Sequence, residues 1–217
     1  MKKKQKRLCL ALALLLAFLA WTAALKLLDV QAIGPNGSQV GLATLNRFVH
    51  SLTGASMPLY VLTDWLGLVP VFVALGFAVL GLFQWIGRKS ILRVDRSILA
   101  LGVFYVALAA VYLLFEEAVI NYRPVLINGV LEASYPSSTT LLVLCVMPTA
   151  GMQFRARIQN AALRRAVLAS VILFTAFTVL GRLVSGVHWF TDILGGVLIS
   201  AALVAFYAAA CTDGQEA

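Results

Sequence analysis

Charge is scarce in this chain. Asp, Glu, Lys and Arg together make up 12% of the 217 residues, whereas 61% are hydrophobic and the mean hydropathy is +0.93. Soluble globular proteins carry about 25% charged residues, so the composition excludes an ordinary water-soluble domain. Apolar runs of roughly 20 residues, each long enough to cross a bilayer as a helix, indicate an integral membrane protein.

Cysteine and histidine are also rare. The cysteines are Cys9, Cys145 and Cys211, which lie in or beside hydrophobic runs, and the histidines are His50 and His188. Neither residue type occurs at the spacing of a metal site, and we interpret the cysteines as small apolar side chains with no disulfide framework. We therefore expect no metal and no cofactor.

The apolar runs predict transmembrane helices rather than barrel strands, because they do not alternate between polar and apolar residues and because backbone groups in lipid must be satisfied within a segment. The fourth run is the weakest, since it is short and contains Pro148. The predicted fold class is an all-α, polytopic bundle of six transmembrane helices. The runs cover approximately residues 8–28, 60–86, 98–119, 138–154, 166–183 and 189–210.

The N-terminal stretch is basic and then apolar, like a secretory signal peptide. Its apolar part is long enough to span, so we predict an uncleaved first transmembrane helix. A long external loop follows, with a short amphipathic surface helix near residues 45–52. We therefore treat residues 1–217 as one membrane domain in which residues 1–59 are the first helix and this loop.

The net charge of +8 resides at the ends of the apolar runs rather than on one face, which favours membrane topology over nucleic-acid binding. Thirteen Lys and Arg residues fall at the N terminus and in the second and fourth connections. Four fall on the other side: Lys26, Arg47, Arg123 and Arg182. The positive-inside rule then predicts cytoplasmic termini and places the connections that contain Arg123 and His188 outside.

The last connection, GRLVSGVHWFTDILGG (residues 181–196), contains Arg182, His188 and Asp192. His188 and Asp192 are four residues apart and share one face if a helix begins near His188. A carboxylate there can accept a hydrogen bond from one imidazole nitrogen and leave the other free as a nucleophile. The alternative is an interfacial histidine beside an aspartate that caps the helix.

The third connection, INYRPVLINGVLEASYPSSTTLL (residues 120–142), contributes Arg123 and the start of the next helix. Ser137 or Ser138 is a suitable N-cap, and the free N–H groups of a helix N terminus bind anions. Two arginines, a helix N terminus and an oriented histidine on one membrane face suit a tetrahedral phosphate. A plain N-cap and a surface arginine are the alternative interpretation.

Taken in their order along the chain, the residues of these two connections resemble three motifs of the phosphatidic acid phosphatase type 2 and haloperoxidase superfamily, in its membrane lipid phosphatase branch. The similarity covers about residues 60–205, the phosphatase-like core. The matches are Arg123-Pro124 in the first motif, Pro136-Ser137 in the second, and Arg182, His188 and Asp192 in the third, with Gly181 where the family has serine.

The resemblance implies hydrolysis of a lipid phosphate or diphosphate at the external membrane face, with His188 forming a phospho-histidine intermediate. Asp192 would orient His188. The phosphoryl oxygens would be held by Arg123, Arg182, Ser137 and Ser138. Membrane lipids are the expected surroundings, no nucleic acid is expected, and the oligomeric state is left open.

Two positions depart from the family pattern. Glu116 replaces the lysine of the first motif, and an acid there repels phosphate. Thr139 replaces the second-motif histidine that protonates the leaving oxygen, and threonine has no useful acidity near neutral pH. Ser138 replaces a glycine, which is a mild change.

Two interpretations remain open. In one, the enzyme acts on a substrate whose leaving group needs no proton, such as a polyprenyl diphosphate, because a departing phosphate titrates at about pH 6. Here His50 is an alternative acid, and Tyr135 and Glu132 are weaker ones. In the other, the chain is a degenerate family member that binds a lipid phosphate or a membrane partner without hydrolysis. A transporter is less consistent, since few ionisable residues lie at mid-membrane depth.

Overall fold

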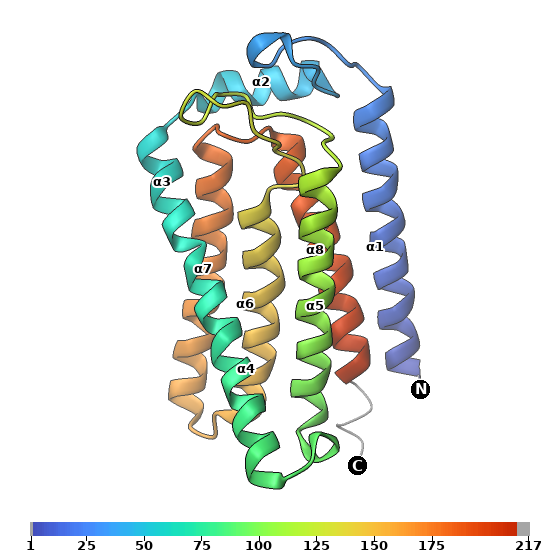
Figure 1. Cartoon of the computed structure of the whole chain (residues 1–217), viewed down its shortest axis with the longest axis vertical. Coiled ribbons are helices and arrows are strands. Elements are labelled where there is room, and N and C mark those ends of the chain that lie inside the picture. The colour runs from blue at the N-terminus through green and yellow to red at the C-terminus, as the bar shows by residue number, and fades with distance from the viewer. Residues whose placement is uncertain (1, 212–217) are drawn as a thin grey trace.

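The computed structural model describes residues 2–211, and most of these are helical (Figure 1). This confirms the predicted all-α class. The α-helices are α1 (Lys2–Leu27), α2 (Ala43–Thr53), α3 (Met57–Leu66), α4 (Leu68–Arg88), α5 (Arg96–Glu117), α6 (Ser138–Arg157), α7 (Ala161–Val184) and α8 (Phe190–Ala210). Two 3₁₀ turns, η1 (Pro35–Gly37) and η2 (Ile91–Arg93), lie in the connections.

The long helices run roughly alongside one another, and α6 lies among them (Figure 1). It contacts α4, α5, α7 and α8, and α1 packs along α8. Because protein surrounds α6, this helix tolerates buried polar residues such as Thr140, Thr149 and Gln153. Five helical segments of the described chain are long and apolar enough to cross a membrane, and α6 is less apolar than these five. The count of six spans is therefore not confirmed by length and hydropathy alone.

Two predicted segments differ in detail from the observed helices. The segment predicted at 60–86 consists of α3 and α4, which meet at Gly67. A Cβ at Gly67 would lie 2.8 Å from the carbonyl oxygen of Asp64 and 3.3 Å from Cγ2 of Thr139, so glycine permits this junction to approach α6. The fourth segment is longer than predicted, because α6 continues through Pro148 to Arg157.

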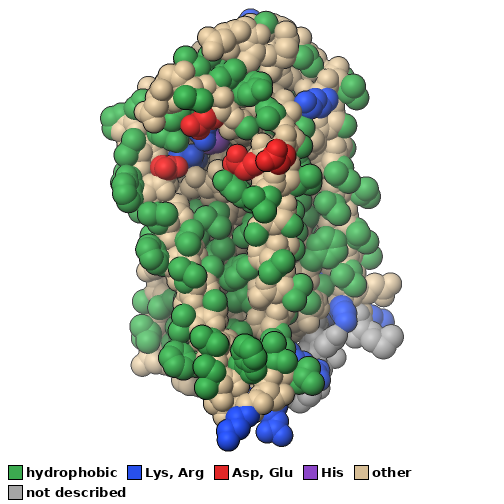
Figure 2. Space-filling view, viewed as in Figure 1, with side chains coloured by type: hydrophobic (Ala, Val, Ile, Leu, Met, Phe, Trp, Pro, Cys, Tyr) green, Lys and Arg blue, Asp and Glu red, His purple; other side chains and the backbone are tan. Residues whose placement is uncertain are grey.

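The two ends of the bundle differ in charge. The start of α1, the α4–α5 turn and the α6–α7 turn lie at one end, which we call the basic end because it carries thirteen Lys and Arg residues (Figures 1 and 2). The opposite end, which we call the site end, carries α2, residues 118–137 and the α7–α8 turn. The amphipathic surface helix expected near residues 45–52 is α2.

Candidate functional site

His188 lies in the short turn between α7 and α8 and is almost fully buried. The turn is held against the segment that precedes α3, where the N–H of Ser56 donates to the carbonyl of Ser185 at 2.8 Å. Gly186 has φ +62°, and a Cβ there would lie 1.6 Å from the carbonyl oxygen of Gly54. Only glycine allows this approach, so the turn fixes where His188 projects.

Two arginines far apart in the sequence converge on His188. Nη1 of Arg123 and Nη2 of Arg182 each lie 3.1 Å from Nε2 of the imidazole. A guanidinium group only donates, so Nε2 is the acceptor and the proton of the neutral ring belongs on Nδ1. Nδ1 donates to the carbonyl oxygen of Ser134 at 3.2 Å. The arrangement leaves the Nε2 lone pair directed at the two positive charges.

The same surroundings keep His188 neutral. Burial, and then the charges of Arg123 and Arg182, hold the pKa of the imidazole well below its usual range, although the hydrogen bond to Ser134 opposes them. An unprotonated Nε2 retains the lone pair that a nucleophile needs.

Asp192 lies beside His188, but it is not the direct hydrogen-bond partner that we predicted. Its Oδ2 is 3.8 Å from Nδ1, beyond hydrogen-bond distance. Oδ2 instead accepts the N–H of Trp189 at 2.9 Å, and Oδ1 accepts Nδ2 of Asn121 at 3.3 Å. The aspartate therefore caps α8 and secures the neighbouring loop, while a backbone carbonyl takes the Nδ1 proton.

Each arginine is also paired with a carboxylate. Nη1 of Arg182 lies 3.5 Å from Oδ1 of Asp64, and Nε of Arg123 lies 3.0 Å from Oε2 of Glu132. The ring of Tyr60 faces both guanidinium groups, with its centroid 4.7 Å from Cζ of Arg182 and 5.6 Å from Cζ of Arg123. Cation–π contacts of this kind stabilise a desolvated guanidinium, so Tyr60 helps to keep two like charges close together.

The N terminus of α6 lies against α8. The N–H of Ser137, the N-cap residue, donates to the carbonyl of Asp192 at 3.1 Å. The predicted side-chain cap is absent, because Oγ of Ser137 makes no cap hydrogen bond and is buried without a partner among residues 2–211. A buried hydroxyl without a partner is costly, and Ser137 is fully buried and does not line the pocket beside His188.

Two glycines in α8 allow the N terminus of α6 to lie this close to α8. A Cβ at Gly195 would lie 2.4 Å from the ring of Tyr135, and one at Gly196 would lie 3.0 Å from Cγ2 of Thr140. The glycine pair therefore permits the close packing of α8 on the start of α6.

A narrow pocket of about 30 Å³ opens beside the histidine, lined by His188, Arg123 and Ser138 among others. Glu116 also lines it, so the acid at the lysine position of the first motif faces the site. In Figure 2 acidic side chains surround a recess in which basic side chains and a histidine are visible. Thr139 is not part of the lining, and its Cγ2 lies toward Gly67.

The alternative proton donors occupy different places. The ring of His50, on α2, packs on that of Trp189 with centroids 5.5 Å apart, and His50 does not line the pocket. Tyr135 lines the pocket, but its hydroxyl is hydrogen-bonded to Oγ1 of Thr22 at 2.7 Å. Glu132 is paired with Arg123.

Four residues of the site were missed by sequence reasoning: Asn121, Ser134, Tyr60 and Asp64. Asn121 and Ser134 flank the loop of Arg123, and the N–H of Ser134 donates to the carbonyl of Asn121 at 2.9 Å. Their polar character inside a membrane-face loop was the available signal. The signal for Asp64 was an acidic residue within the apolar run 60–86, and Tyr60 gave no separate signal.

Comparison with known proteins gives one family and one similar structure. A family model of the PAP2 superfamily matches residues 50–213. The fold is similar to the crystal structure of a transmembrane PAP2 type phosphatidylglycerolphosphate phosphatase from Bacillus subtilis, with a TM-score of 0.62, 19% sequence identity, and coverage of 95% of this chain and 96% of that one. The comparison with curated protein sequences finds no match.

Proposed function

This chain belongs to the PAP2 superfamily, and we propose that it is a membrane phosphohydrolase that removes phosphate from a lipid phosphate or diphosphate through a phospho-histidine at His188. The observation that carries the proposal is the position of Nε2 of His188, 3.1 Å from a nitrogen of each of two buried arginines. A phosphoryl group at this point would contact the nucleophile, and the two guanidinium groups would neutralise the charge of its oxygens.

Phosphate binding would require a local rearrangement of the two arginine contacts to Nε2 of His188. Both guanidinium groups now donate to Nε2, so the phosphoryl oxygens must replace the imidazole as their acceptors. Tyr60 would keep Arg123 and Arg182 in place during this exchange. Oγ of Ser137 and the free N–H groups at the start of α6 would supply the remaining donors.

The reaction then proceeds in two steps. Nε2 of His188 attacks phosphorus, and the bond between phosphorus and the leaving oxygen breaks. Water next attacks the phosphorus of the phospho-histidine, which releases inorganic phosphate and restores the imidazole. The carbonyl of Ser134 would stabilise the positive charge that develops on the ring, with Asp192 contributing from 3.8 Å.

The missing acid restricts the substrate. Thr139 lies toward Gly67 rather than in the pocket lining, and a threonine hydroxyl would not protonate a leaving alkoxide near neutral pH. A lipid monophosphate leaving group carries its charge without a proton near neutral pH, since its second pKa is about 6. We therefore propose that a lipid diphosphate, such as a polyprenyl diphosphate, is the better substrate.

Phosphate release by the purified protein in detergent tests this proposal. A polyprenyl diphosphate and a phosphatidic acid are compared at equal concentration, with His188→Ala as the inactive control and His50→Gln as a matched histidine substitution outside the pocket. We expect release from the diphosphate that disappears in His188→Ala and persists in His50→Gln. Equal turnover of both lipids would contradict the substrate restriction.

The second candidate is a family member that binds a lipid phosphate without cleaving it. Glu116 in the pocket and the absence of a histidine at Thr139 favour it. Loss of a general acid typically lowers a rate about 10²- to 10⁴-fold. No release above the His188→Ala level from either lipid, together with saturable binding of the diphosphate lipid, would support binding without hydrolysis.

The membrane orientation belongs to the same proposal. We infer that α6 completes a set of six spans, because it lies among the long helices and packs against four of the five apolar segments. The thirteen cations of the basic end would face the cytoplasm and the site end would face outside.

A further inference from the structure

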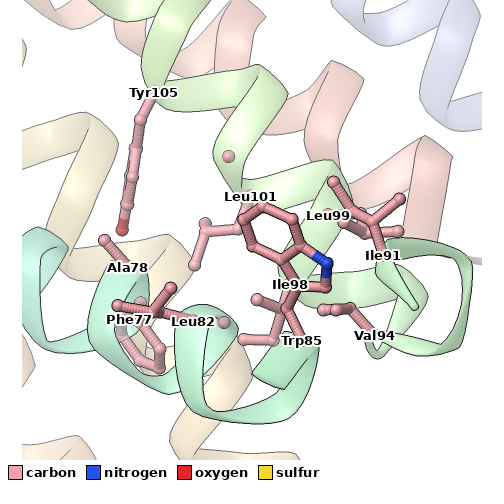
Figure 3. A pocket seen from close by; sticks show the side chains of 12 residues that line it. Phe77, Ala78, Leu82, Trp85, Ile91, Val94, Ile98, Leu99, Leu101 and Tyr105 are labelled. Atoms are coloured by element: carbon pink, nitrogen blue, oxygen red, sulfur yellow. The ribbon is translucent and has the colours of Figure 1, made fainter. Parts of the chain in front are cut away.

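A second hollow lies toward the basic end, between α4 and α5. Its volume is about 340 Å³, within the range of roughly 300–1,000 Å³ for ligand pockets. Figure 3 shows its walls, with Leu82 and Trp85 from α4, Leu101 and Tyr105 from α5, and Ile91 and Val94 from the connection. It shares no lining residue with the pocket of His188. We call it the α4–α5 groove.

A glycine, which has no side chain, helps to create the groove. Gly102 lines it, and a Cβ at this position would meet no atom within 4 Å. Leu82, Trp85 and Ile91 in its wall are 48%, 49% and 52% exposed, so the groove opens on the outer face of the bundle and an occupant can enter it from the bilayer. Water is a poor one, since each buried molecule needs two to four polar partners. Among the lining residues, Tyr105 and Trp85 supply the only polar side-chain atoms.

The connection that closes the groove is rich in positive charge. Residues 88–96 carry four exposed basic side chains and one acidic residue, Asp95. Asp95 already pairs with Arg88 at 2.9 Å and with Arg157 at 3.1 Å. Within the described chain, the remaining three cations have no acidic partner: Lys89, Arg93 and Arg96.

The apolar and basic features are continuous along the chain. Arg93 lies between the lining residues Ile91 and Val94, and Lys89 follows Trp85 by about one helical turn. A ligand that fits both the apolar groove and the adjacent basic residues has a long apolar tail and an anionic head group. Phospholipids combine these features, and basic residues near the membrane surface attract anionic head groups.

We propose that the α4–α5 groove binds one anionic phospholipid, with an acyl chain between α4 and α5 and the phosphate near Lys89, Arg93 and Arg96. The site is separate from the proposed catalytic pocket and does not depend on the proposed hydrolysis. Its ligand stays bound as a structural lipid that fills the groove and neutralises the three unpaired cations.

Native mass spectrometry of the delipidated full-length protein tests this inference. Phosphatidylglycerol and phosphatidylcholine with identical acyl chains are titrated separately. We expect one phosphatidylglycerol to bind saturably and more tightly than phosphatidylcholine. Gly102→Leu, which fills the groove, should abolish this binding, whereas the matched substitution Gly76→Leu, which also meets open space but does not line the groove, should retain it.

A second variant keeps the test informative if Gly102→Leu does not fold. Arg93→Gln with Arg96→Gln changes two exposed side chains and should reduce the preference for phosphatidylglycerol by about fivefold for each cation removed. Equal, non-saturable binding of both lipids in every variant would indicate annular lipid only and overturn the proposal. Loss of binding in Arg123→Gln but not in Gly102→Leu would assign the lipid to the pocket of His188 and would also overturn it.

Discussion

His188 shows how individual contacts set chemistry in this molecule. Two arginines direct donors at Nε2, and a backbone carbonyl takes the proton of Nδ1, so one tautomer is selected and its lone pair is placed among positive charges. The cost of holding Arg123 and Arg182 together is offset by Tyr60, Asp64 and Glu132 around them.

The first prediction concerns the protonation of His188. Because the pKa in the folded protein lies well below the ordinary value, the ring should stay neutral as the pH falls through about 6.5. The unfolded chain binds the proton first, so the stability contributed by this group is present above pH ~6.5 and is lost as the pH falls toward the folded pKa.

Nitrogen NMR of histidine-labelled His50→Gln protein measures this directly, since one histidine remains. We expect no imidazole transition near pH 6.5 while the protein is folded. A full titration at that pH in the folded state would show that the two arginines do not act on the ring as inferred.

The second prediction concerns Glu116. Its carboxylate lines the pocket that would receive the phosphate, so Glu116→Gln should raise kcat/KM for a lipid diphosphate. A repulsion on the order of 1 kcal/mol corresponds to about fivefold. The neighbouring Glu117→Gln removes the same charge outside the pocket lining and should change kcat/KM little. A large decrease in Glu116→Gln would mean instead that the carboxyl group takes part in the reaction.

At the scale of elements, the site depends on how closely α8 approaches the start of α6. Helix positions were predictable from apolar runs, but the contact between these helices rests on Gly195, Gly196 and the hydrogen bond from Ser137 to the carbonyl of Asp192. This contact brings the residues of two distant motifs together.

The third prediction follows from that contact. Gly195→Ala should destabilise the protein by about 1–3 kcal/mol, because the new Cβ would lie 2.4 Å from the ring of Tyr135. The gain in helix propensity, up to about 1 kcal/mol, does not offset the clash. Gly76→Ala in α4 meets no atom within 4 Å and is the matched control. Thermal unfolding in detergent should separate the two variants, and equal midpoints would contradict the packing argument.

At the scale of the whole molecule, charge divides the bundle into a basic end and a site end. The fourth prediction is that these ends face opposite sides of the membrane. In a variant whose three native cysteines are replaced by alanine, Asn36→Cys should react with an impermeant maleimide in intact cells. Leu92→Cys, which is at a highly exposed position of the basic end, should react only after lysis. The reverse pattern would invert the proposed orientation.

Part of the site was visible in the sequence because its side chains carry distinctive chemistry. Arg123, Arg182, His188 and Asp192 stand out in apolar surroundings, and the structure brings all four together. The carbonyl of Ser134 was not visible, since every residue has one. The pairing of Asn121 with Asp192 was also hidden, because it spans 71 positions and depends on the path of a loop.

The sequence by itself determined the membrane class, the helical state, the separation of charge between the two ends, and the order of the candidate site residues. Each follows from local composition, because lipid forces backbone pairing within a segment and charge is costly at depth. Only the tertiary structure decided that α6 is surrounded by protein, that Asp192 caps α8 instead of bonding His188, and that a groove lies between α4 and α5. These features depend on which helices pack together and how closely, and single segments do not encode that.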